Sequence, residues 1–298
     1  MAVIKLKHLI YNLMVVGASL WCIDYSRPVF GQQLDPVFYP APRSANDKRV
    51  EYPVQLLNLA LSKVRTGYEL RPSNVNITQS RALKLLMAGE TVDVVWTMTT
   101  IEREEQFLPV RIPIYKGLIG WRIFLINRDD QSRFALVNTP EQLAKFMAGQ
   151  GLDWPDKDIL RFNRLPVEGS STYEALFDML QKRRFEYFPR SVIEIWQELA
   201  VHSQQGFSVE NHLLLHYPTA LYYFVKKDNV QLAADIQTGL EAAIADGSFE
   251  RLFVKFHQTS IDRAKMSERK LFQLTNPDLP ADTPLEQSHL WFNIGAQH

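Results

Sequence analysis

The sequence predicts an α/β protein, and three observations near its start support this. Residues 35–40 and 68–77 are short strand-like segments, each followed by a segment with apolar residues at helical spacing. In the second helical segment, Thr78 can cap the first N–H groups and Gly89 can end the helix. The run VDVVW at 92–96 is typical of a strand buried on both faces. This β-α-β-α-β order predicts a parallel or mainly parallel sheet covered by helices.

The later segments continue the alternation in a second region. The apolar run at 112–126 contains Gly117 and Gly120 and predicts a crossing into that region, whereas Pro218 and Thr219 predict the crossing back. The tail from about Phe272 has too many prolines for a helix but enough apolar residues to pack down. Further helices are predicted at 139–149, within 168–184, at 191–203, 229–247 and 248–258, and further strands at 161–167, 184–189, 212–217 and 220–228.

The amino-acid composition indicates the size of the folded chain and excludes one class of partner. The chain has 298 residues, 46% of them hydrophobic and 22% charged, which is enough for two domains with buried cores. Lys plus Arg and Asp plus Glu both number 33, so no overall positive field exists to hold a nucleic acid. We therefore expect no nucleic-acid partner. Separately, we expect a monomer that binds a small molecule.

Residues 1–31 have the pattern of a secretory signal. Lys5 and Lys7 precede an apolar run of about 15 residues, and Gly31 offers a small residue for cleavage. A buried N-terminal helix or a single membrane anchor are the alternatives, but the run is short for a span of about 20 residues. The only cysteine, Cys22, lies in this segment. We expect a periplasmic protein, cleaved near Gly31, whose mature chain has no thiol for catalysis or metal binding.

Two polar segments are candidates for ligand binding. Thr97, Thr99, Thr100 and Arg103 follow the buried strand, and ligands of α/β sheets bind beyond the carboxyl ends of strands. The run 169–172, Gly-Ser-Ser-Thr, precedes a helix whose first N–H groups can receive an anion. No nucleophile elbow, phosphate loop or dinucleotide-binding glycine pattern is present in the sequence. The spacing of His212 and His216 would suit a metal only on a helix, so we expect neither a metal nor a cofactor.

The order of these segments resembles the periplasmic solute-binding proteins of the amino-acid ABC transporter type, solute-binding family 3, which have the type 2 periplasmic-binding-protein fold. The likeness rests on Thr100-Ile101-Glu102-Arg103, on the 169–172 turn, and on the closing strand and helices within 222–256. It implies a two-lobed fold with a ligand cleft between the lobes and hinges near Tyr115 and Thr219. Lobe 1 would comprise residues 32–114 and 219–298, including the tail, and lobe 2 residues 115–218.

The resemblance also implies the residues that hold the ligand. Arg103 would grip a carboxylate beside Thr99 and Thr100, and Tyr39 and Trp96 would form aromatic walls. In lobe 2, the N–H groups of the turn would receive the same anion, with Arg190 close by. Each residue has a structural alternative: Arg103 lies in an acidic surface run, Trp96 suits a core, and the turn suits a helix cap. The implied site residues are Tyr39, Trp96, Thr99, Thr100, Arg103, Gly169, Ser170, Ser171, Thr172 and Arg190.

The identity of the solute is constrained by one departure from the family pattern. The amino-acid binders place an acid near the strand at 184–189, where this chain has Arg190. A basic residue there argues against a plain α-amino acid and favours a solute with more negative charge or without an amine. We expect a small polar or anionic, carboxylate-bearing solute that is delivered to an ABC permease or reported to a receptor. One alternative is an enzyme on the same fold, similar to cyclic-acid dehydratases, with Glu102 or Glu186 as the acid. The other is an interaction module that has lost its ligand.

Overall fold

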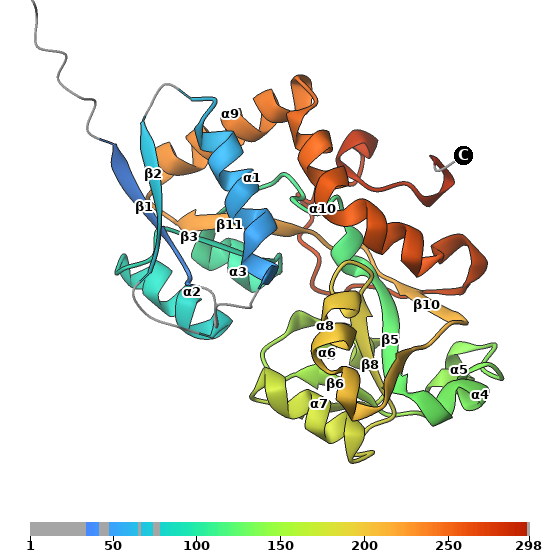
Figure 1. Ribbon diagram of the computed structural model, residues 1–298. Helices are drawn as coiled ribbons and strands as arrows, with labels where there is room; N and C mark the ends of the chain where they lie inside the picture. Colours follow the sequence, from blue (N-terminus) through green and yellow to red (C-terminus); the bar gives the residue numbers. More distant parts are fainter. Residues whose placement is uncertain (1–33, 42–47, 65–66, 74–77, 297–298) are drawn as a thin grey trace, which may run out of the picture. The chain divides into compact units, whose positions relative to one another are not determined.

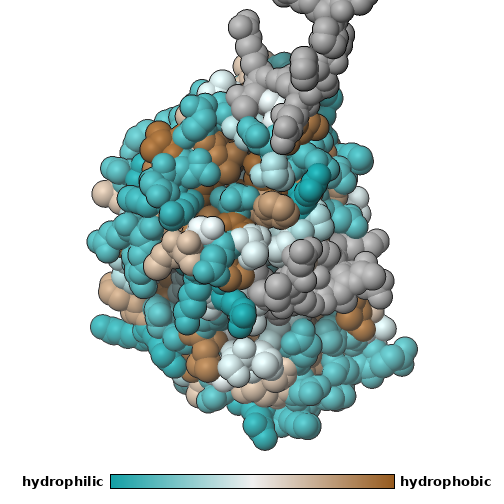
Figure 2. All heavy atoms as spheres, turned by 90° about the vertical axis from the view of Figure 1, so that its left-hand side faces the viewer, coloured by the Kyte–Doolittle hydropathy of each residue, from teal (hydrophilic) through white to brown (hydrophobic). Residues whose placement is uncertain are grey.

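The computed structural model describes residues 34–41, 48–64, 67–73 and 78–296 (Figure 1). The predicted signal segment and its cleavage position near Gly31 lie outside these residues. Within the described ranges, no helix combines the length and apolar character needed to cross a membrane. Figure 2 shows one face of the molecule, on which hydrophilic side chains surround separate, smaller hydrophobic areas.

The first group of strands comes from two separate parts of the chain. Strands β1 and β2 are parallel, whereas β11 is antiparallel to both β3 and β4. The Phe38 N–H donates to Asp93 Oδ2 at 2.8 Å and the Asp93 N–H donates to the Phe38 carbonyl at 2.8 Å, so β1 and β3 are neighbours. The strands are β1 (Asp35–Tyr39), β2 (Tyr68–Pro72), β3 (Val94–Met98), β4 (Phe107–Val110) and β11 (Leu221–Lys226).

Helices cover both faces of β3, β11 and β4, and successive side chains of each strand point to opposite faces. Val94 packs with the buried leucines of α1 and α9, whereas Val95 packs with Ala82 and Leu86 of α2. Gly239 lets α9 approach α1, since a Cβ atom there would lie 2.0 Å from the Ala60 carbonyl oxygen. The helices of this group are α1 (Glu51–Leu61), α2 (Gln79–Ala88), α3 (Ile101–Gln106), α9 (Val230–Ala245) and α10 (Ser248–Ala264), with the 3₁₀ helix η1 (Lys48–Val50) before α1.

The second group forms one sheet in the order β12-β10-β5-β8-β6-β7, with β9 paired to β5. Along β5, Ile123 and Leu125 face α7 and α8, while Phe124 and Ile126 face the side covered by α4, α5 and α6. The strands are β5 (Trp121–Asn127), β6 (Ala148–Gly151), β7 (Val167–Ser170), β8 (Tyr187–Ser191), β9 (Phe207–Val209), β10 (Leu213–His216) and β12 (Lys270–Gln273). The helices are α4 (Gln131–Phe134), α5 (Pro140–Leu143), α6 (Pro155–Phe162), α7 (Tyr173–Gln181) and α8 (Ile195–Val201).

The chain passes between the two groups at 111–120, at 217–220 and again before β12. The third passage was not predicted, because the tail carries no motif that assigns it to a sheet. Beyond β12 the tail returns to the first two crossings: Asn276 Nδ2 donates to the Pro218 carbonyl at 3.0 Å, and the Phe292 N–H donates to the Lys116 carbonyl at 2.7 Å. Trp291 lies so close to Gly117 that a Cβ atom there would be 2.5 Å from the indole.

The prediction of a parallel or mainly parallel sheet was wrong, because β3 and β4 both pair with β11 in the antiparallel direction. Two predicted segments also differ from the structure. The helix predicted at 139–149 ends at Leu143, and residues 148–151 form β6 instead. Glycine is a poor strand former, but a Cβ atom at Gly149 would collide with Phe185, so the close packing of this strand requires glycine. The strand predicted at 161–167 begins only at Val167, because α6 continues through Phe162.

Candidate functional site

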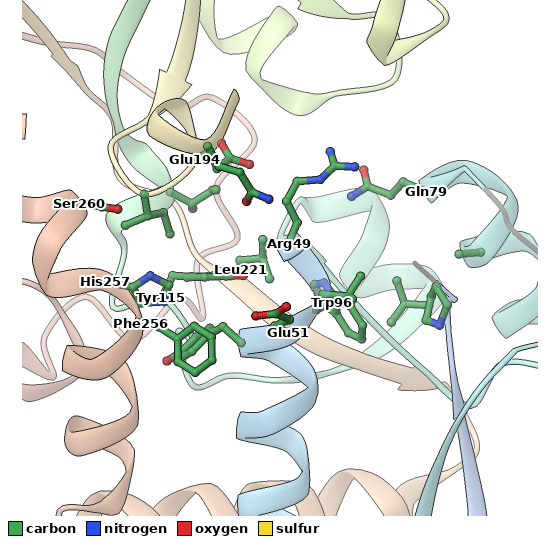
Figure 3. Close-up of a pocket in the computed structure, with 18 of the residues that line it drawn as sticks. Arg49, Glu51, Gln79, Trp96, Tyr115, Glu194, Leu221, Phe256, His257 and Ser260 are labelled. Atoms are coloured by element: carbon green, nitrogen blue, oxygen red, sulfur yellow. The ribbon is translucent and has the colours of Figure 1, made fainter. Parts of the chain in front are cut away.

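A pocket of about 430 Å³ lies between the two groups of strands, with walls from both (Figure 3). The first wall comes from the start of α1 and from β3. Arg49 and Glu51 flank the point where α1 begins, so their side chains leave the helix end and enter the pocket. Trp96 is on the face of β3 that carries Val94, and its ring centroid lies 6.2 Å from that of Tyr39.

The second wall is aromatic and comes from α10 and the first crossing. His257 contacts Tyr52 edge-on at 4.3 Å between ring centroids and Tyr115 at 5.3 Å, and Phe256 and Ser260 continue the wall. His257 is only 6% exposed, and burial lowers the pKa of its imidazole from 6.5 to about 3. The ring is therefore neutral at pH 7. Its Nε2 atom has no hydrogen-bond partner among the described residues.

The third wall comes from the turn before α8 and includes Glu194 and Gln197. Glu194 is held from behind, by Arg190 Nη2 at 3.1 Å, Arg122 Nη1 at 3.4 Å and the Ser191 N–H at 3.2 Å. Burial would raise the pKa of Glu194, but Arg190 and Arg122, with smaller contributions from the Ser191 N–H and Arg49, lower the pKa below its ordinary value. The pocket therefore contains an ionised carboxylate in a fixed orientation.

Behind this wall lies a buried network of paired charges. Arg190 donates to Glu198 through Nε at 2.8 Å and Nη2 at 2.7 Å, and the Tyr173 hydroxyl donates to the same carboxylate at 2.7 Å. Arg122 pairs with Asp156 at 2.5 Å. Glu198 and Asp156 thus hold the two arginines that pair with Glu194, so the network fixes the position of Glu194. Removal of one partner would leave an uncompensated buried charge.

Of the residues predicted in lobe 1, the structure brings Trp96 to the pocket. Tyr39 contacts Trp96 but is not among the described lining residues. The Arg103 guanidinium donates to Thr97 Oγ1 at 3.0 Å, to the Met98 carbonyl at 2.7 Å and to Gln79 Oε1 at 3.4 Å. Its direct contacts are thus with β3 and with Gln79, which does line the pocket.

Thr99 and Thr100 have structural partners at the start of α3. The Thr99 hydroxyl donates to Glu104 Oε1 at 2.6 Å, and Thr100 Oγ1 accepts the Arg103 N–H at 3.1 Å as a helix cap. Neither threonine is among the described lining residues of the pocket. The roles of Arg103, Thr99 and Thr100 in ligand binding stay predictions.

The residues predicted in lobe 2 lie at the end of β7 and in the buried network. Gly169, Ser170, Ser171 and Thr172 lead into α7, where Ser170 Oγ accepts the Thr172 N–H at 3.2 Å. Arg190 is 3% exposed and is directed to Glu198 and Glu194. None of these five is among the described lining residues of the pocket, so their ligand contacts stay predictions as well.

Sequence reasoning missed the charged and imidazole residues of the described lining: Arg49, Glu51, Glu194 and His257. Glu194 and His257 lie within predicted helices, where a charged or imidazole side chain gives no signal of its own, and the sequence around Arg49 has no recognisable motif. Glu102 and Glu186, the candidate acids of the enzyme alternative, are not among the described lining residues. Glu186 instead accepts the Met147 N–H at 2.7 Å.

Comparison with protein-family profiles finds no match, and none is found among curated proteins. Solved structures do match. An ancestral arginine-binding protein bound to arginine is 17% identical, with a TM-score of 0.57 over 75% of this chain and 98% of its own. A histidine kinase sensor domain with similarity to periplasmic binding proteins is 15% identical, with a TM-score of 0.57 over 76% and 96% of the two chains.

A third similar structure is the ancestral amino-acid-binding protein AncCDT-1, described as a precursor of cyclohexadienyl dehydratase. It is 14% identical, with a TM-score of 0.54 over 75% of this chain and 95% of its own. At such identities the likeness shows the fold alone. The chain has the two-lobed α/β fold of periplasmic binding proteins, which confirms the predicted fold class.

Proposed function

We propose that this protein is an exported solute-binding protein that holds a small polar solute in the pocket between its lobes. The observation that carries the proposal is the pocket itself, whose walls come from both strand groups. Lobe 1 would comprise residues 32–114 and 219–298, with β12 contributing to the sheet of lobe 2, and lobe 2 would comprise residues 115–218. The first 31 residues would direct export to the periplasm.

Contacts between the walls support binding by closure of the lobes. The Arg49 guanidinium carbon lies 4.6 Å from the ring centre of Tyr173, and the Trp196 indole N–H donates to the Ser260 carbonyl at 3.0 Å. Ser80 of α2 also donates to Asp153, which lies between β6 and α6. A solute that contacts both sides favours the closed arrangement, because only there does it make all of its contacts.

The predicted preference for a carboxylate-bearing solute depended on Arg103 and Arg190. Among the described lining residues, Arg49 is the guanidinium that faces the pocket, so a carboxylate on the solute would meet Arg49. Delivery to an ABC permease and reporting to a receptor use the same pocket. The fold accommodates either role, since binding proteins and a kinase sensor domain share it.

Thermal unfolding of the mature chain tests the proposal. The panel should contain amino acids, amines, dicarboxylates, and keto and aromatic acids. A bound solute at 100 times its dissociation constant should raise the free energy of unfolding by about 2.7 kcal/mol, which shifts the melting temperature measurably. A folded protein whose melting temperature responds to no class of solute would contradict the proposal.

A further inference from the structure

We propose that the pocket selects a solute with an organic cation, an ammonium or guanidinium group, and accepts it with the carboxylates of Glu51 and Glu194 beside aromatic side chains. This inference rests on the proposed solute binding at the same pocket. It adds the sign of the charge and the residues that recognise it. The predicted anchors, Arg103 and Arg190, indicated the opposite sign, because arginines bind an anion.

The described charged residues of the lining and of the network behind Glu194 leave one carboxylate in excess. Among the described lining residues, Glu51 and Glu194 carry negative charge and Arg49 carries positive charge. The network behind Glu194 adds two guanidinium groups and two further carboxylates. Three guanidinium groups thus meet four carboxylates: Arg49, Arg122 and Arg190 with Glu51, Asp156, Glu194 and Glu198. A monocation in the pocket would balance this set, whereas an anion would increase the excess.

The neutral lining side chains do not reverse this balance. His257 is uncharged at pH 7, because burial lowers the pKa of its imidazole to about 3. Burial, with smaller contributions from neighbouring groups, raises the pKa values of Tyr52 and Tyr115, so both phenols keep their protons. These three side chains therefore add no charge to the pocket at pH 7.

The aromatic residues provide the second part of a cation site. Trp96, Tyr115, Tyr52 and Phe256 line the pocket, and Figure 3 shows the Glu51 carboxylate between Phe256 and Trp96 in this view. The face of an aromatic ring attracts a cation, by about 0.5–2 kcal/mol depending on desolvation. Carboxylates with aromatic rings beside them suit an ammonium or guanidinium group on an apolar body.

The two arginines predicted to bind an anion are occupied elsewhere. Arg190 is directed to Glu198 and Glu194, and Arg103 donates to Thr97 and Met98. Glu194, the N-cap residue of α8, lines the pocket instead. The orientation of Glu194 is fixed by Arg190, Arg122 and the Ser191 N–H, so it needs little rearrangement to accept a donor.

Matched pairs of compounds isolate the sign of the charge. We would titrate the mature chain at pH 7 with 2-phenylethylamine against 3-phenylpropanoate and with pentylamine against hexanoate, and with phenylalanine and lysine as zwitterionic references. Calorimetry and thermal unfolding provide the two readouts. We expect at least one amine to bind at least tenfold more tightly than the carboxylate of the same skeleton.

Variants then test the residues. Glu51→Gln removes an exposed charge at a helix end and should weaken binding of the amine at least tenfold while changing the melting temperature of the free protein little. Glu194→Gln should weaken binding as well. Glu194→Gln also disturbs the charged network. If that variant unfolds, Glu51→Gln alone tests the carboxylate acceptors. Glu90→Gln, an exposed glutamate outside the described lining of the pocket, is the matched control.

The outcomes separate this inference from the proposed function. Binding of carboxylates without binding of amines overturns the cation site and leaves solute binding intact. Equal affinity of an amine for the wild type and for Glu51→Gln overturns the assignment of the acceptor. A panel in which no compound binds contradicts both the cation site and solute binding at this pocket.

Discussion

Arg190 and Glu194 are four residues apart in the sequence and form an ion pair at 3.1 Å, yet only Glu194 lines the pocket. Arg190 belongs to β8 and is buried against Glu198, whereas Glu194 belongs to the turn before α8 and reaches the pocket. The resemblance predicted that this neighbourhood belongs to the second lobe. It did not reveal which of the two side chains turns inward, because that depends on partners from α8 and β5 that are distant in sequence.

The pKa of His257 predicts a pH dependence of stability. Below pH 6.5 the unfolded chain binds a proton at this histidine, while the folded chain resists protonation down to about pH 3. The contribution to stability is therefore complete above pH 6.5 and is lost as the pH falls. Between pH 7 and pH 5 we expect this residue to account for a loss of about 2 kcal/mol.

Urea unfolding of the wild type and of His257→Gln at both pH values measures this contribution. The variant should lose less stability on acidification than the wild type, and His289→Gln, at an exposed position, is the control. Identical losses in the wild type and in His257→Gln would contradict the assignment of a buried, neutral imidazole.

Arg103→Ala tests the predicted carboxylate anchor. If the guanidinium contacts the solute, the variant loses binding. The hydrogen bonds to Thr97 and Met98 predict, in addition, a loss of stability of about 2 kcal/mol, because buried acceptors lose a charged donor. Affinity should be measured well below the melting temperature of the variant, with Arg81→Ala, at an exposed position, as the control. Unchanged affinity would remove Arg103 from the site.

At the scale of elements, the residues that begin and end α2 and that cap α5 were predicted well. Thr78 caps α2 and Gly89 ends it with φ of +69°, and Thr139 with Gln142 forms the capping box of α5. Such signals are local, so they can be found in the sequence. The strand β6 was missed because the sequence Ala-Gly-Gln-Gly has low strand propensity, and only packing beneath Phe185 and Trp154 explains its glycines.

Gly239→Ala tests the contact between α9 and α1. Alanine normally stabilises the interior of a helix by about 1 kcal/mol relative to glycine. Here its methyl group would lie 2.0 Å from the backbone oxygen of Ala60, so the two helices would have to separate. We therefore expect the free energy of unfolding to fall by more than about 1 kcal/mol. Urea unfolding checks the sign, and a gain in stability would contradict the close approach.

The matched control for that experiment lies one residue away. Thr238 is exposed in the same helix, and Thr238→Ala should raise stability by about 0.5 kcal/mol, since it changes helix propensity without steric conflict. Opposite signs for two neighbouring substitutions would show that packing, rather than helix propensity, determines the effect at Gly239.

At the scale of the whole molecule, the order of strands and helices predicted an α/β protein, and its resemblance to the periplasmic solute-binding proteins implied the two lobes. The order did not predict that β12 joins β10 in the second sheet, or that the tail then packs on the first two crossings. Both features depend on contacts between distant parts of the chain, such as Trp291 with Gly117. The pocket lies beyond sequence prediction for the same reason, since its lining comes from segments between Pro40 and Ser260.

Hydrogen–deuterium exchange with and without a bound solute tests the central claim most directly, because it locates the site. The pocket predicts slower exchange on binding in segments of both lobes at once: 49–52, 95–96, 115–119, 193–197 and 256–260. Slower exchange in all of these places the solute between the lobes. Binding that leaves these segments unchanged would contradict a solute site in this pocket.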